Sequence, residues 1–181
     1  WGKAAIDISK CLGNQFGPIY CMENVGDGPL VRGSGTYGVY VHPKSDLGNS
    51  NANIFWGEVG GSTQGDYYFD DQELSGGNNV ILAGIAQGGD IYEVYAKKCR
   101  GLKVYGLHCE QSAPLAGKVS VQLDACSYST IDLSNGDKAA FTTVGGVPCE
   151  RSSITGHCDA VVIDADALLC RDDTDQSYNM F

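Results

Sequence analysis

The chain has 181 residues, with 22 acidic against 12 basic side chains and a formal net charge of −10. This length allows one ordinary domain or two small ones with a real core. The acidic balance excludes non-specific binding to nucleic acid, because phosphate backbones would repel the protein at long range. No apolar run approaches the ~20 residues that cross a bilayer, so we expect no membrane-spanning segment.

Residues that favour strands and turns dominate the composition. There are 25 glycines and 10 tyrosines but only 2 methionines. This balance predicts a mainly β fold, either an antiparallel β-sandwich or an α+β sandwich with one or two short helices.

The first 98 residues are expected to form a β-rich section of short strands separated by turns. Apolar runs at 35–43 and 53–59 flank a polar loop rich in Gly, Asn and Ser. Further along, Gly88-Gly89-Asp90 separates two strand-like runs, which predicts a β-hairpin.

The clearest strand pattern lies at 117–126. Apolar residues alternate there with Lys118, Ser120, Gln122 and Asp124, the period of a half-buried antiparallel strand. Asn135-Gly136 then predicts a second hairpin, because both residues tolerate positive φ. Residues 158–173 fit either a strand or a short helix.

Eight cysteines form an even set that favours a disulfide framework and hence a secreted, extracellular protein. They are Cys11, Cys21, Cys99, Cys109, Cys126, Cys149, Cys158 and Cys170. Nine residues separate Cys11 from Cys21 and Cys99 from Cys109, a spacing that suits bridges across a hairpin or to a neighbouring strand. No C-x-x-C spacing occurs, which argues against zinc and redox sites, and the pairing stays open.

The cysteine distribution also predicts the domain organisation. Residues 22–98 contain no cysteine, whereas 99–181 contain six of the eight. We therefore expect one compact body of two subdomains, a β-rich section at 1–98 and a disulfide-rich section at 99–181.

One short segment carries most of the clustered positive charge, at Lys97, Lys98, Arg100 and Lys103. A solvated strand edge is one interpretation, since lysines there discourage edge-to-edge pairing. A docking patch for an acidic partner is another, and a dibasic protease site at Lys97-Lys98 is a third.

Acidic and aromatic residues are mixed at 66–73, a combination shared with carbohydrate sites. Tyr67, Tyr68 and Phe69 are predicted to be exposed loop residues that bind a partner. A catalytic alternative pairs Asp70 or Asp71 with Glu93 or Glu58, as acid and base of a glycosidase.

The remaining motifs predict no metal and no cofactor. The aspartates of 163–175 lack the spacing of a calcium loop. His42, His108 and His157 belong to no catalytic or zinc motif.

Without a catalytic signature, the sequence favours a binding protein of the toxin or host-directed effector type, a virulence factor whose surface loops engage a protein receptor or a cell-surface glycan. One alternative is a secreted polysaccharide hydrolase that uses an Asp/Glu pair. Another is a structural or adhesive surface protein, which would self-associate and expose a broad apolar patch.

Overall fold

The computed structural model describes residues 4–21, 37–42, 50–62, 65–70, 77–87, 91–110 and 118–174, with Cys21 described only in its backbone. Within these ranges it contains strands and no helix, and therefore no helix that could cross a membrane. The strands are β1 (Ala4–Ser9), β2 (Gln15–Cys21), β3 (Tyr37–His42), β4 (Ile54–Gly60), β5 (Gly65–Asp70), β6 (Val80–Gln87), β7 (Tyr92–Lys97), β8 (Lys103–Glu110), β9 (Val119–Asp124), β10 (Thr130–Asn135), β11 (Lys138–Thr142), β12 (Ser153–Gly156), β13 (Ala160–Ile163) and β14 (Arg171–Thr174).

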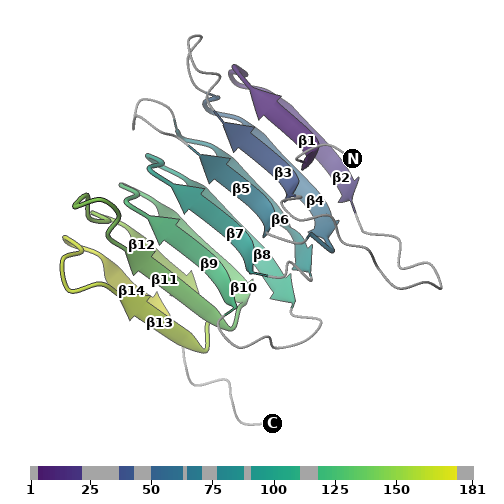
Figure 1. Ribbon diagram of the computed structural model, residues 1–181. Coiled ribbons are helices and arrows are strands. Elements are labelled where there is room, and N and C mark those ends of the chain that lie inside the picture. Colours follow the sequence, from purple (N-terminus) through teal and green to yellow (C-terminus); the bar gives the residue numbers. More distant parts are fainter. Residues whose placement is uncertain are drawn as a thin grey trace, which may run out of the picture.

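The strands form two seven-stranded parallel sheets, and the chain alternates between them. The odd-numbered strands make one sheet in the order β1 to β13, and the even-numbered strands make the other. Figure 1 shows the result, two layers of arrows that progress from β1 and β2 at one end to β13 and β14 at the other. Each odd strand and the even strand after it form one rung, so the protein is a β-solenoid of seven rungs.

The predicted antiparallel sandwich and the α+β alternative are both wrong. Every strand pairs in parallel with the strand two places along the chain. Asn135-Gly136 does not close a hairpin, because β10 and β11 lie in different sheets. The same holds for β6 and β7, although residues 88–90 themselves lie outside the described residues. Residues 158–173 contain β13 and the start of β14.

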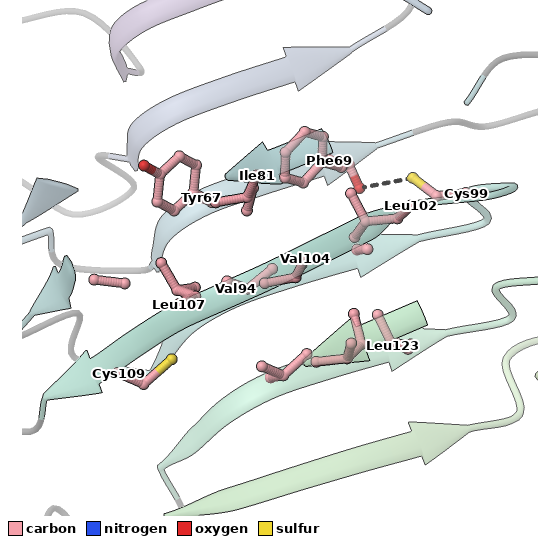
Figure 2. Close-up of a cluster of buried hydrophobic side chains, with 14 of the residues drawn as sticks. Tyr67, Phe69, Ile81, Val94, Cys99, Leu102, Val104, Leu107, Cys109 and Leu123 are labelled. Atoms are coloured by element: carbon pink, nitrogen blue, oxygen red, sulfur yellow. Dashed lines mark hydrogen bonds between the residues drawn. The ribbon is translucent and has the colours of Figure 1, made fainter. Parts of the chain in front are cut away.

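The hydrophobic core fills the space between the two sheets. Along most strands alternate residues point inward, as the alternation predicts. One core cluster includes buried side chains from both predicted subdomains, residues 1–98 and 99–181. Figure 2 shows Tyr67, Phe69, Val94 and Leu123 of the odd-numbered sheet beside residues of the even-numbered sheet. Full burial of each such side chain stabilises the fold by about 1.5–3 kcal/mol.

The corner between each odd strand and the following even strand repeats one backbone shape. In all seven rungs, the residue two places before the even-numbered strand has a positive φ. These residues are Gly13, Ala52, Asn78, Gly101, Tyr128, Arg151 and Leu169. In four rungs a cysteine lies two residues before this positive-φ residue: Cys11, Cys99, Cys126 and Cys149. Five residues after each of these cysteines, a Phe, Val or Ile side chain points into the core. This repeat is hard to see in the sequence, because the segments between corners differ in length.

Three of these cysteines form a column at the corner. Cys99 Sγ donates a hydrogen bond to Phe69 O (3.5 Å), Cys126 Sγ to Ala96 O (3.3 Å) and Cys149 Sγ to Leu123 O (3.2 Å). The three accepting carbonyls are themselves neighbours in the sheet register. Cysteine suits this position because it is small and apolar, and its thiol is a weak donor for a carbonyl of the preceding rung.

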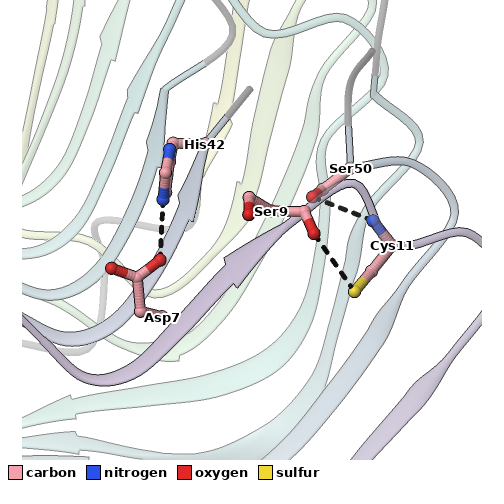
Figure 3. A network of polar contacts seen from close by, with 5 residues as sticks. All are labelled: Asp7, Ser9, Cys11, His42 and Ser50. Atoms are coloured by element: carbon pink, nitrogen blue, oxygen red, sulfur yellow. Dashed lines mark hydrogen bonds and ion pairs between the residues drawn. The ribbon is translucent and has the colours of Figure 1, made fainter. Parts of the chain in front are cut away.

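At the first corner, the cysteine Cys11 forms different hydrogen bonds. Cys11 Sγ donates to Ser9 O at 3.5 Å within its own rung, and Cys11 N donates to Ser50 Oγ at 3.3 Å (Figure 3). Ser50 holds the cysteine position in the second rung, since Asn51 after it pairs with Leu12. The same view shows His42 Nε2 2.6 Å from Asp7 Oδ1 across β1 and β3.

The prediction of a disulfide-stabilised fold is wrong for the described cysteines, because all seven whose side chains the structure describes are free thiols. Cys99 precedes β8 and Cys109 lies near the end of that strand; Cys11 likewise precedes β2, and Cys21 is the last residue of β2. An extended strand separates its residues by roughly 3.3 Å each, which is too far for a bridge across nine of them. The description as a disulfide-bonded, secreted toxin or virulence factor loses its basis with the disulfides.

The free thiols can be counted by titration with a thiol reagent. Without any reductant, a thiol reagent should titrate at least seven groups per chain after denaturation. In the native protein Cys109 and Cys126 should react slowly, because burial raises the pKa of both thiols. A denatured count of two or fewer would contradict the free-thiol structure and restore the disulfide framework.

Candidate functional site

The predicted binding residues Tyr67, Tyr68 and Phe69 do not lie in an exposed loop. They form the centre of β5. Tyr67 and Phe69 point inward, and their relative solvent exposures are 0% and 1%. Tyr68 points to the outer face of the odd-numbered sheet and is also buried. Two of the three are therefore core residues, which cannot reach a partner in the folded protein.

Tyr68 is the centre of a row of stacked aromatic rings. Tyr40, Tyr68 and Tyr95 are neighbours in the register, with ring centroids 5.0 and 4.8 Å apart. Tyr37 and Tyr92 pack against the same row. Burial is the largest cause that raises the pKa of the Tyr68 and Tyr95 phenols. Because the rings cover one another, their faces are poorly available to a ligand.

The predicted catalytic carboxylates are not brought together. Asp70 ends β5 on the outer face beside Lys97 of β7, whereas Glu93 is fully buried inside the solenoid. Glu58 is half-buried on β4, and Asp71 lies outside the described residues. The two sides of a β-sheet thus separate Asp70 from Glu93.

A different charged cluster lies inside the fold. Asp66 and Glu93 occupy equivalent positions in neighbouring rungs and are both fully buried. Lys118 Nζ lies 2.6 Å from Glu93 Oε1, and its side chain is 3% exposed. Asp66 Oδ1 accepts a hydrogen bond from Ser62 N at 3.4 Å, while Oδ2 has no hydrogen-bond partner among the described residues.

Two buried carboxyl groups therefore share one cation. Burial raises the pKa of Glu93 to about 7, against the opposing effect of Lys118, and burial raises the pKa of Asp66 well above its usual value. The cluster can hold a proton, but its burial leaves no exposed surface for a substrate. The strand pattern had placed Lys118 and Ser120 on the solvent face, and the structure buries both.

The basic segment is divided by a corner of the solenoid. Lys97 lies on the outer face of the odd-numbered sheet, between Asp70 and Asp124 in the register. Arg100 lies at the corner, and Lys103 begins β8 on the other sheet. The interpretation as a strand edge is wrong, since β7 and β8 are central strands of their sheets.

Arg151 joins this group from a distant part of the chain. The guanidinium carbons of Arg100 and Arg151 lie 5.1 and 5.3 Å from the centroid of the Tyr128 ring. Arg151 Nη1 also donates a hydrogen bond to Tyr128 Oη. The three residues come from the corners of three successive rungs, so only the solenoid brings them together.

The outer face of the even-numbered sheet carries a group of apolar side chains over β4, β6 and β8. Inward positions there are already filled by core residues, so the alternate side chains point outward. Leu82 and Tyr105 are register neighbours with 41% and 40% exposure. The half-buried members of this apolar face are Ile54, Trp56, Val80 and Ile85.

No metal site emerges from the described residues, which contain no group of three or more His, Cys, Asp or Glu side chains placed to hold an ion. His157 Nε2 lies 3.5 Å from Asp159 Oδ1, which is a surface pair. His108 is half-buried on β8.

Comparison with family models, with curated proteins and with solved structures finds no match to this chain.

Proposed function

We propose that this protein is a binding protein that holds a polysaccharide chain against the apolar face of its even-numbered sheet. The observation that supports the proposal is the exposure of Leu82 and Tyr105 side by side on a sheet whose core is already complete. Exposed apolar groups gathered on one face commonly mark an interaction site.

The shape of this face favours an extended partner. A parallel sheet presents its side chains in rows about 4.8 Å apart, which makes a flat, repeating surface. Small molecules are usually held in concave pockets instead. Polar groups border the apolar residues in the register: Glu58 and His108 flank Ile85, and Asp132 follows Tyr105. Aromatic and polar groups side by side suit a sugar chain, whose rings stack and whose hydroxyls form hydrogen bonds.

The binding surface is thus a sheet face rather than the loops that the sequence favoured. The catalytic alternative receives no support from the described carboxylates, because Asp70 and Glu93 lie on opposite sides of the sheet. The adhesive alternative predicted an exposed apolar patch, which is the same feature, so the test must separate a glycan from a second copy of the chain.

Replacing Tyr105 with alanine should weaken polysaccharide binding by about tenfold or more, because a central aromatic anchor is lost. Affinity electrophoresis through gels that contain neutral or acidic polysaccharides measures the effect. Thr155→Ala is the matched control, since Thr155 lies in the same outward row two strands away. Leu82→Ser should weaken binding in the same way.

Retardation by none of the polysaccharides would overturn the proposal. So would equal retardation of the wild type and the Tyr105 variant. Self-association of the wild type that Tyr105→Ala abolishes, seen by sedimentation, would identify a second copy as the occupant and would also overturn it.

A further inference from the structure

We infer that the partner is an acidic polysaccharide, whose carboxylate or sulfate groups are bound by a basic corner beside the apolar face. The basic corner consists of Lys98, Arg100, Lys103 and Arg151. This inference rests on the proposed function and specifies the chemistry of its ligand.

The basic corner is a positively charged region on an acidic protein. The chain as a whole carries −10, yet Arg100 and Arg151 meet here at Tyr128, and Lys98 and Lys103 lie within three residues of Arg100 in the sequence. Arg100, Lys103 and Arg151 are exposed, and Lys98 is half-buried. Glu150 is the carboxylate that shares the corner column with Arg100, with Ser127 between them.

The four cations are not neutralised by carboxylates of the described residues. Among the residues that the structure describes, none of them forms an ion pair. Arg171 provides the contrast, since it begins β14 in the same register column as Lys103 and lies 3.8 Å from Asp173. Four cations that have no ion-pair partner among the described residues, gathered at one place on an acidic protein, attract an anionic partner there.

Tyr128 holds two of the cations in place. Arg100 and Arg151 stack on its ring from neighbouring rungs, which restricts both guanidinium groups before any ligand arrives. A guanidinium binds a carboxylate or a sulfate through two parallel hydrogen bonds. Two oriented guanidinium groups therefore suit a chain that carries anionic groups at intervals.

The basic corner and the apolar face are continuous. Lys103 and Tyr105 both point outward from β8, two residues apart, and Lys103 neighbours Val80 of the apolar face. One ligand can thus contact aromatic and cationic groups together. An acidic peptide would use the cations, but an acidic sugar chain also supplies rings for Tyr105, so the combination favours the polysaccharide.

The experiment compares four probes on the intact protein: polygalacturonate, heparin, neutral dextran and poly-glutamate. The double variant Arg100→Ala/Arg151→Ala should weaken binding of polygalacturonate or heparin by about tenfold or more. Arg171→Ala is the matched control and should change binding little. Binding should also weaken as salt rises toward about 0.15 M, because screening reduces exposed charge interactions.

Tyr128→Leu gives a second variant that keeps all four charges. It should reduce binding of the acidic polysaccharide less than the double variant does, because only the orientation of the arginines is lost. The melting temperature of each variant shows whether it remains folded.

The outcomes separate the inference from the proposed function. Neutral dextran bound as tightly as the acidic chains, with loss in Tyr105→Ala and none in the arginine variant, would overturn the inference and keep the proposed function. Binding of poly-glutamate but of no polysaccharide would overturn both. Acidic chains bound with sensitivity to both sets of substitutions would support both.

Discussion

Gly84→Ala is expected to lower the free energy of unfolding by about 3–5 kcal/mol, because strain and overpacking add at this position. Gly84 has φ +125°, a conformation that side chains rarely adopt, and a Cβ there would lie 2.1 Å from Gly57 O of the neighbouring strand. The obstructing atom belongs to the backbone of a parallel ladder, so it cannot move without breaking the pairing of β4 with β6.

Gly106→Ala is the matched control for this prediction. Gly106 lies in the adjacent strand β8 and also has a positive φ, +64°, but a Cβ there would meet no atom within 4 Å. Its replacement should cost only about 1 kcal/mol, the strain of a left-handed residue. Urea denaturation of both variants measures the difference, and equal losses would show that close backbone contact is not what requires Gly84.

Lys118→Met should lower the free energy of unfolding by about 3–5 kcal/mol near neutral pH, the usual cost of breaking a buried ion pair. The substitution removes the ammonium group that lies 2.6 Å from Glu93 Oε1, and it leaves the carboxyl groups of Glu93 and Asp66 buried. Lys138→Met is the matched control, because Lys138 is a half-buried lysine on β11 of the same sheet. A loss below about 1 kcal/mol would show that Lys118 does not stabilise the cluster.

The same cluster predicts a pH dependence. The pKa of Glu93 is raised to about 7 in the folded protein from 4.5, so folding takes up a proton between these values. The stabilisation is complete below about pH 4.5 and is lost as the pH rises through 7, roughly 3 kcal/mol in total. Asp66 changes stability in the same direction, because its pKa is also raised.

Glu93→Gln tests this dependence, since it removes the titrating group while nearly preserving its volume. Unfolding free energies measured from pH 4.5 to 8 should fall less steeply in this variant than in the wild type. Glu110→Gln, on the exposed end of β8, should retain the wild-type slope. Equal slopes in the wild type and Glu93→Gln would contradict the assignment.

The sequence indicated some of the residues of the candidate site, but not which of them lie together in the fold. Lys98, Arg100 and Lys103 are neighbours in the chain, so their charge was visible, and their role as a binding patch remains a prediction. Arg151 and Tyr128 could not be added to them, because the stacking of successive rungs, not nearness in sequence, brings these corners together. The apolar face was equally hidden, since Leu82 and Tyr105 are distant in the sequence and become neighbours only when β6 and β8 pair.

The sequence by itself determined that the chain forms strands and which residues of many strands face inward. Val121 and Leu123 point into the core as their alternation predicts, since the period of two is a local property of extended backbone. It did not determine the direction or the partners of those strands. A turn such as Asn135-Gly136 permits a hairpin, but here the chain continues into the opposite sheet. Pairing across whole rungs is a long-range property, so only the tertiary structure decided that the sheets are parallel, that the cysteines stack as free thiols, and which charges meet.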